Sequence, residues 1–177
     1  KDDLIKILEE NWSALGYPSK AHEEKYKNEG KKILSEFFDK SYDPKNLPLS
    51  LEQIFSVKIS PTLKVGGRID RIDKVAEGIE IIDYKTGKSP TKKDVEKDLQ
   101  MTIYAMVAMN ETEEVKVSFY FFANQEKISS FRKKEDFEVV KQELIKKAEE
   151  ISKNDFSPTP GKHCDFCEFK LVCEAWS

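Results

Sequence analysis

The sequence lacks the features of a membrane or secreted protein. No apolar run in its 177 residues approaches the roughly 18 that a membrane helix requires, and no signal-peptide pattern opens it. It contains only three cysteines, all within the last 14 residues. An odd, clustered set of this kind does not suit a disulfide framework. We therefore expect a protein of the reducing cytoplasm that has no membrane partner.

An excess of positive charge is also missing. The net charge is −3, so any site for a polyanion must be a local basic patch. What the chain does have is 36% charged residues, 11 Phe and 6 Tyr, a water-soluble composition with enough aromatic mass to pack a core. It begins at Lys1 without Met and reads like the middle of a domain. We therefore expect a fragment of a longer chain that lacks an N-terminal segment of the domain.

Hydrophobic periodicity predicts an α/β chain. Helices are expected at about 1–15, 21–38, 92–109 and 134–152, and strands at about 51–59, 63–74, 79–85 and 115–123, with 126–132 pairing beside the last. The order is helix, three-stranded antiparallel meander, helix and strand, followed by a C-terminal helix. We expect one core over residues 1–155 and a cysteine-bearing tail, 156–177, that packs on the same domain.

The segment "GGRIDRIDKVAEGIEIIDYKTGK" (66–88) reads as a β-hairpin with unusual polar residues. A turn centred between Ala76 and Glu77 places Asp70 opposite Asp83, with Cβ atoms about 5 Å apart. Lys85 lies two residues beyond Asp83 in the same strand and therefore shares its face. The predicted register brings two carboxylates and an ammonium together.

Two carboxylates this close repel each other unless a cation or a proton lies between them. Asp70 and Asp83 are therefore candidate ligands for Mg²⁺ or Mn²⁺, hard ions that prefer oxygen ligands and leave positions for water and phosphate. Lys85 could then position an attacking water or stabilise phosphoryl charge. The alternative is a solvated Asp–Lys pair on an exposed sheet face.

The helix after the hairpin contributes a second polar pair. Gln100 and Tyr104 are four residues apart on one helix face, where they could hydrogen-bond a phosphate or orient Lys85; Tyr104 could also be an aromatic at the edge of the core. Basic side chains near the hairpin supply the local positive charge on which a DNA backbone, as a single strand or a duplex end, would lie. They are Arg68, Arg71, Lys85 and Lys88.

"GGRIDRID", "IIDYKTGK" and "QMTIY", in this order, resemble the motifs of RecB-type PD-(D/E)XK nucleases. The resemblance runs from about residue 20 to the end and implies a restriction-endonuclease-like core. It implies that Asp70 and Asp83 bind the metal, that Lys85 assists the attacking water, and that Gln100 and Tyr104 are accessory residues. Glu52, in "SLEQIFSVKI", resembles the Glu that opens the strand before these motifs, as a catalytic, electrostatic or structural neighbour.

The resemblance implies a metal-dependent DNA exonuclease that acts in DNA repair and recombination. It also implies a helicase in the same polypeptide or complex, because the chain looks most like the helicase-fused members. The family usually contributes a His upstream, but Leu34 stands where it would fall and the surroundings of His22 do not match. A second possibility is therefore a catalytically weak or inactive nuclease-fold module that binds DNA or holds an assembly together.

"HCDFCEFKLVC" near the end contains Cys164, Cys167 and Cys173 in the spacing C-x₂-C-x₅-C. The residues alone allow free thiols, a Cys₃His zinc site that uses His163, or an iron–sulfur cluster, which requires four thiolates. Iron–sulfur members of the resembled family carry this spacing after the nuclease core. The resemblance thus implies a 4Fe-4S cluster whose fourth Cys lies outside this chain; a zinc-stabilised structural domain is the alternative.

Overall fold

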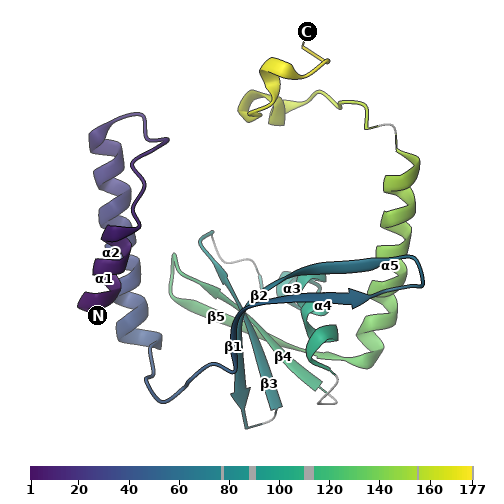
Figure 1. Cartoon of the computed structure of the whole chain (residues 1–177), viewed down its shortest axis with the longest axis horizontal. Helices are drawn as coiled ribbons and strands as arrows, with labels where there is room; N and C mark the ends of the chain where they lie inside the picture. The colour runs from purple at the N-terminus through teal and green to yellow at the C-terminus, as the bar shows by residue number, and fades with distance from the viewer. Residues whose placement is uncertain (77, 88–90, 110–113, 155, 177) are drawn as a thin grey trace.

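The computed structural model describes residues 1–76, 78–87, 91–109, 114–154 and 156–176. A five-stranded sheet forms its centre, with helices on both sides (Figure 1). The strands are β1 (Ser50–Lys58), β2 (Lys64–Val75), β3 (Gly78–Lys85), β4 (Glu114–Phe121) and β5 (Glu126–Lys133). The helices are α1 (Asp2–Glu10), α2 (Lys20–Ser41), α3 (Lys92–Glu96), α4 (Leu99–Ala108) and α5 (Lys134–Lys153), and two short 3₁₀ turns follow, η1 (Lys162–Phe166) and η2 (Lys170–Val172).

The sheet confirms the predicted α/β class and strand order. Strands β1, β2 and β3 form an antiparallel meander, β3 and β4 are parallel, and β4 and β5 are antiparallel. The parallel pair requires a crossover, which α3 and α4 provide. The mixed sheet with flanking helices is consistent with a restriction-endonuclease-like core.

The predicted hairpin register is also confirmed where β2 and β3 pair. Arg71 lies opposite Ile82 and Val75 opposite Gly78. Gly78 has φ of 128°, a conformation that glycine adopts without steric cost directly after a tight turn. The turn residue Glu77 lies outside the described residues. One further step in the same register sets Asp70 against Asp83.

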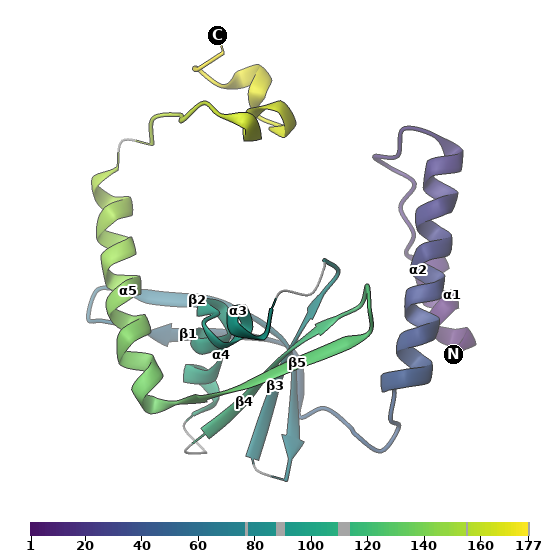
Figure 2. The same ribbon diagram turned by 180° about the vertical axis from the view of Figure 1, so that it is seen from behind.

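The two faces of the sheet are covered differently. On one face, α3 contacts β5 and α4 contacts β1, β3 and β4, and this side holds the fully buried core side chains Ile81, Val95, Met101 and Val117. On the other face, Phe37 of α2 meets the rings of Tyr84 and Tyr120. Seen from behind, α5 and the α1–α2 pair stand at opposite ends of the sheet (Figure 2). None of the described helices combines the length and apolarity needed to cross a membrane.

The predicted helix over 92–109 is two helices. Asp98 interrupts it with extended backbone, φ −65° and ψ 124°, and its side chain accepts a hydrogen bond from the amide of Met101. Thr91 and Asp94 form a capping box at the start of α3. An Asp that caps the following turn competes with helix continuation, so the apolar periodicity alone does not reveal the break.

Arg132 of β5 joins the sheet to this pair of helices. Its buried guanidinium donates to Oγ1 of Thr102 at 2.8 Å, to Oγ of Ser130 at 2.7 Å and to the carbonyl oxygen of Val95 at 2.7 Å. Burial lowers the pKa of Arg132. The side chain thus ties residues of α3, α4 and β5 together through three buried hydrogen bonds.

We therefore expect Arg132→Leu to lower the free energy of unfolding by about 2–4 kcal/mol, since the substitution removes three buried hydrogen bonds from a charged donor. Urea denaturation followed by circular dichroism measures this change. Lys134→Ala, in the exposed first turn of α5, is the matched control and should shift stability by less than about 0.5 kcal/mol. Equal effects of the two substitutions would contradict the proposed role of the buried network.

Candidate active site

Asp70 lies where β2 separates from β3. Strand β2 pairs with β3 only from Arg71 to Val75, whereas it pairs with β1 along most of its length. At this point the Oδ2 atom of Asp70 accepts a hydrogen bond of 2.8 Å from the backbone amide of Tyr84. The carboxylate thus takes the place of a backbone hydrogen bond between the two strands. This bond holds Asp70 beside β3.

Asp83 is the buried carboxylate of the site, with 3% of its surface exposed. Its Oδ2 lies 2.6 Å from Nζ of Lys85, yet accepts no hydrogen bond from any described residue. Burial raises the pKa of Asp83 despite the opposing effect of Lys85, and the charges of Asp70 and Asp98 act in the same direction as burial. The carboxylate is therefore buried with Lys85 as its ion-pair partner, in an environment where a further cation would favour its charged form.

Lys85 is held by a chain of side chains from α4. Its Nζ donates to Oε1 of Gln100 at 3.1 Å, and Nε2 of Gln100 donates to the hydroxyl of Tyr104 at 2.8 Å. Tyr104 in turn donates to the carbonyl oxygen of Arg68 at 2.9 Å. The ammonium also lies 5.2 Å from the centre of the Phe119 ring. With its side chain 38% exposed, Lys85 is fixed in direction and still open to solvent.

Tyr104→Phe tests this chain. The variant keeps the ring, which packs edge-on against Phe55 at 5.6 Å, and removes only the hydroxyl. We expect stability to fall by about 1 kcal/mol. Any metal-dependent hydrolysis should fall by about ten-fold, because Gln100 and Lys85 lose their anchor. Kinetic assays measure the hydrolysis, and thermal unfolding measures the stability. Tyr26→Phe, at an exposed ring of α2, is the control. Unchanged hydrolysis in Tyr104→Phe would contradict a positioning role.

Glu52 and Arg68 lie next to this centre but face solvent. In the β1–β2 register Glu52 stands between the Leu51–Arg71 and Gln53–Ile69 pairs, opposite Asp70. Its backbone has a φ of 51°, an uncommon conformation for a residue other than glycine. The Glu52 carboxylate is 63% exposed and accepts a hydrogen bond of 3.2 Å from Arg68. The described contact of Glu52 is thus with Arg68 and not with Lys85.

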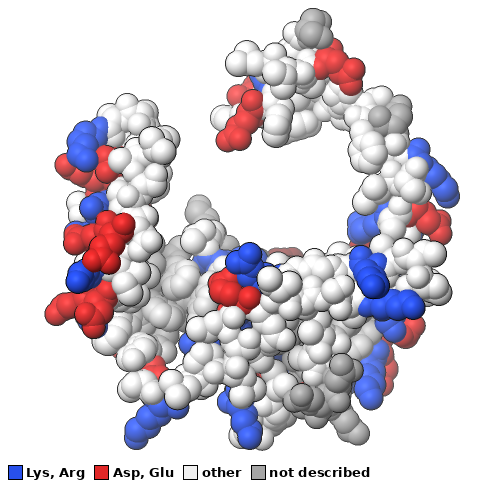
Figure 3. Space-filling view, in the orientation of Figure 1, with Lys and Arg blue, Asp and Glu red and all other residues white. Residues whose placement is uncertain are grey.

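Arg71 is not brought together with the other predicted residues. It is the neighbour of Asp70 in the strand and therefore projects from the opposite face. There its Nε donates to Asp73 at 2.7 Å and its Nη2 donates to the carbonyl oxygen of Asn46 at 3.1 Å. Lys88 lies outside the described residues. In the view of Figure 3, acidic and basic side chains are intermixed along α1 and α2 and on the side of α5.

Two residues near the site were missed by the sequence reasoning. Asp98 caps α4, and its charge acts on both Asp83 and Tyr104. A capping Asp directly before "LQM" was the available signal. Phe119 pairs with Asp83 in the parallel ladder and sits beneath the ammonium of Lys85. This contact could not be predicted, because it depends on the register of the parallel strands.

The donor set fits a magnesium- or manganese-type ion in its chemistry. Such ions take one or two carboxylates and complete their coordination with water and phosphate oxygens. Asp70 and Asp83 can supply those carboxylates, and the burial of Asp83 with its charge near that of Asp70 is the observation that favours this. Within the described ranges, no three His, Cys, Asp or Glu side chains come close enough to hold a metal by themselves.

The cysteine tail does not form a complete ligand set. Cys164 is buried and accepts a bond of 3.4 Å from the amide of Gly161, Cys167 is exposed and Cys173 is partly exposed. In the described tail these three are not gathered as metal ligands, and an iron–sulfur cluster needs four thiolates. The three cysteines alone therefore do not fit the predicted cluster.

Away from the tail, His22 packs its ring against Tyr26 at 4.8 Å.

A mixed sheet that carries an Asp at the strand split and an Asp-x-Lys on the next strand defines a restriction-endonuclease-like nuclease fold. The family model of the PD-(D/E)XK nuclease superfamily matches residues 1–174, and the chain belongs to this superfamily. No curated protein matches the sequence. Among solved structures, "Crystal structure of SSO0001" is similar over 99% of this chain and 96% of that chain, with 15% identity and a TM-score of 0.40.

Proposed function

We propose that this chain is a metal-dependent nuclease domain that hydrolyses DNA phosphodiester bonds. The observation that carries the proposal is the buried Asp83, whose carboxylate is ion-paired with Lys85 and lies across the hairpin from Asp70. Membership of the nuclease superfamily supports the same reaction class. Asp70 and Asp83 would hold Mg²⁺ or Mn²⁺, which when bound lowers the pKa of water and neutralises phosphoryl charge.

The protein residues have separate roles in the proposed reaction. A water oxygen forms a bond to phosphorus while the bond to one bridging oxygen breaks, and the leaving oxygen gains a proton as the water loses one. Lys85 stabilises the negative charge that grows on the phosphoryl oxygens. Gln100 and Tyr104 hold Lys85 in place, and Arg68 is positioned to contact the DNA backbone. We assign Glu52 an electrostatic role through Arg68 and leave Arg71, which projects from the opposite face, out of the contacts at this centre.

The biological setting is proposed from the resemblance of the motifs alone. It supports exonuclease action in DNA repair and recombination, in association with a helicase. End-labelled single-stranded and blunt duplex DNA incubated with the protein and Mn²⁺ test the activity and its mode. Stepwise shortening that chelation stops supports an exonuclease; internal fragments would support an endonuclease. Saturable binding without cleavage in either Mg²⁺ or Mn²⁺ would support the alternative, a DNA-binding or assembly module.

For the tail we propose that Cys164, Cys167 and Cys173 complete a metal or cluster site only with a ligand from outside this chain. Anaerobically purified protein should therefore contain well under one equivalent of iron and show no visible absorption from a thiolate-bound cluster. Elemental analysis with a visible spectrum measures this. Stoichiometric iron and sulfide would contradict the prediction, and one equivalent of zinc would instead support the zinc-stabilised alternative.

A further inference from the structure

A cavity opens on the face of the sheet that does not carry Asp83 and Lys85. It has a volume of about 340 Å³ and lies between the end of α2, the loop that follows it and strands β2 to β5. Ile82 and Tyr84 line it, and they alternate along β3 with Asp83 and Lys85. Its size falls within the range of about 300–1,000 Å³ typical of small-molecule sites.

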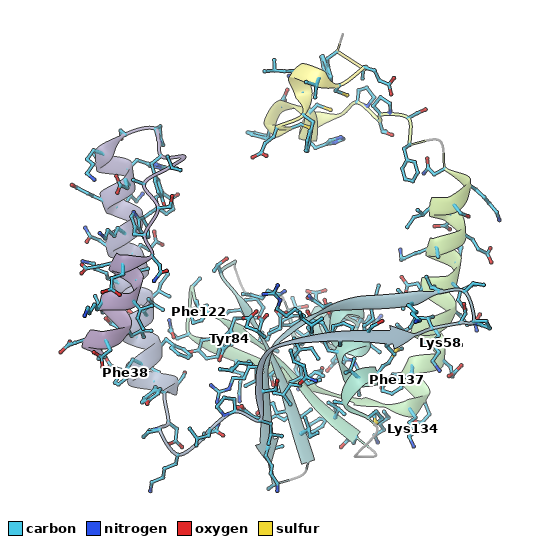
Figure 4. All side chains as sticks on the ribbon, viewed as in Figure 1. Phe38, Lys58, Tyr84, Phe122, Lys134 and Phe137 are labelled. Atoms are coloured by element: carbon cyan, nitrogen blue, oxygen red, sulfur yellow. The ribbon has the colours of Figure 1, made fainter. Side chains whose placement is uncertain are left out.

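Aromatic rings in fixed positions form one side of this cavity. Phe37 meets Tyr120 edge-on at 5.3 Å and Tyr84 at 6.2 Å, and Tyr84 stacks on Phe122 at 5.3 Å. Figure 4 shows Tyr84 and Phe122 side by side near the end of α2. The rings are therefore held in place by their neighbours before any ligand arrives.

Hydrogen bonds fix the polar end of the same wall. The hydroxyl of Tyr120 lies 2.7 Å from Oγ of Ser41 and donates to Oε1 of Gln125 at 2.7 Å. Gln125 adopts φ of 55° and donates from Nε2 to the carbonyl oxygens of Ile33 and Phe122. A strained residue that is anchored on both sides gives a rigid, pre-organised rim.

Cations outnumber anions around the cavity. Arg71 pairs with Asp73 at 2.7 Å, and Lys127 lies 3.0 Å from Glu80. Lys40, at the exposed end of α2, has no ion-pair partner among the described residues. Arg71 has five N–H donors, of which Asp73, the Asn46 carbonyl and the Tyr84 side chain take three. One net positive charge and unused donors therefore face the cavity, which suits an anion.

We propose that this cavity binds a nucleotide, with its phosphate against Lys40 and Arg71 and its base against the partly exposed ring of Tyr84. A base offers the π-face that aromatic side chains bind, and a phosphate accepts the hydrogen bonds of a guanidinium. The amide oxygen of Asn46 remains available to a base edge, because its amide nitrogen donates to Asp73. Two sources offer this chemistry: a free mononucleotide and the terminal nucleotide of a DNA strand.

Nuclear magnetic resonance titrations in the presence of a chelator test the site without any hydrolysis. We expect dAMP to cause saturable shifts of the amides of Lys40, Asn46 and Tyr84. A 5′-phosphorylated oligonucleotide is the second probe, and the probe that saturates these shifts at lower concentration identifies the source. Deoxyadenosine and inorganic phosphate should each bind at least about ten-fold more weakly than dAMP, since each keeps only one half of the contacts.

Lys40→Glu should weaken dAMP binding by at least about ten-fold, because it reverses the unpaired charge at the rim. Lys25→Glu is the matched control: it makes the same charge change at an exposed site earlier in α2, and it should alter binding by less than about two-fold. The proposal is overturned if no saturable shift occurs with either probe or if the two variants lose binding equally. It is also overturned if inorganic phosphate binds as well as dAMP, or if the shifts centre on Gln100 and Tyr104.

Discussion

Lys85→Ala should abolish most of the metal-dependent DNA hydrolysis, with a loss of about 10²–10³-fold in rate. The ammonium lies 2.6 Å from Asp83 and is held by Gln100 at 3.1 Å, so it is aimed at the carboxylate that would hold the cation. Alanine removes the positive charge that would stabilise the phosphoryl oxygens and leaves those carboxylates in place. Single-turnover cleavage of labelled DNA in Mn²⁺ measures the chemical step directly.

Lys74→Ala is the matched control for this experiment. Lys74 lies in the same hairpin, pairs with Ile79 across it and is exposed, so the substitution removes one lysine from β2 without touching the Asp83 cluster. The control should keep nearly full activity, and DNA binding by Lys85→Ala should stay within about three-fold of the parent, since Lys85 is one of several cationic contacts. If Lys85→Ala cleaves at the parent rate while it remains folded, the proposed catalytic role is wrong.

Asp83→Asn should remove the stabilisation of the protein by Mn²⁺ as well as its hydrolytic activity. A cation at about 100 times its dissociation constant stabilises a folded protein by about 2.7 kcal/mol. For a chain of 177 residues this corresponds to a rise of about 5–10 °C in the melting temperature. The neutral amide of the variant lacks the charge that attracts the ion. Thermal unfolding at increasing Mn²⁺ concentration measures the difference.

Without a cation, the same variant should be at least as stable as the parent at neutral pH. Burial raises the pKa of Asp83, so the carboxylate costs stability; this cost grows as the pH rises above the pKa of the unfolded chain and is complete above the raised pKa. This cost disappears as the pH falls and the carboxyl group is protonated, and parent and variant should then converge. Asp3→Asn, in the exposed first turn of α1, is the control and should retain the Mn²⁺-dependent rise. A full Mn²⁺-dependent rise in Asp83→Asn would exclude Asp83 as a ligand.

The hairpin could be predicted because its signals are local. Alternating apolar residues on both sides of a two-residue turn permit one register that buries Ile72 and Ile81 together, and the structure has this register. The same alternation also determines that Arg71 projects away from Asp70, so Arg71 does not share the face of the Asp83 centre. Pattern and turn chemistry thus determine which residues share a face.

Other features depend on contacts that a linear pattern does not contain. The break at Asp98 arises because a side-chain cap replaces helix continuation, although the apolar spacing runs through it. The position of Phe119 under Lys85 depends on parallel pairing between strands that are far apart in sequence. The tail has neither helical nor strand periodicity, so its cysteine spacing predicts ligand chemistry but not the placement of the thiols.

Tyr84 contributes to both faces of the sheet. Its amide is bonded to Asp70 on the front of the sheet, while its ring lines the cavity behind. At this point a single residue of β3 therefore separates the two compartments, the candidate active site on the front and the cavity on the back. A substitution at Tyr84 will alter both compartments together, whereas changes at Lys85 and at Lys40 act on the front and the back separately.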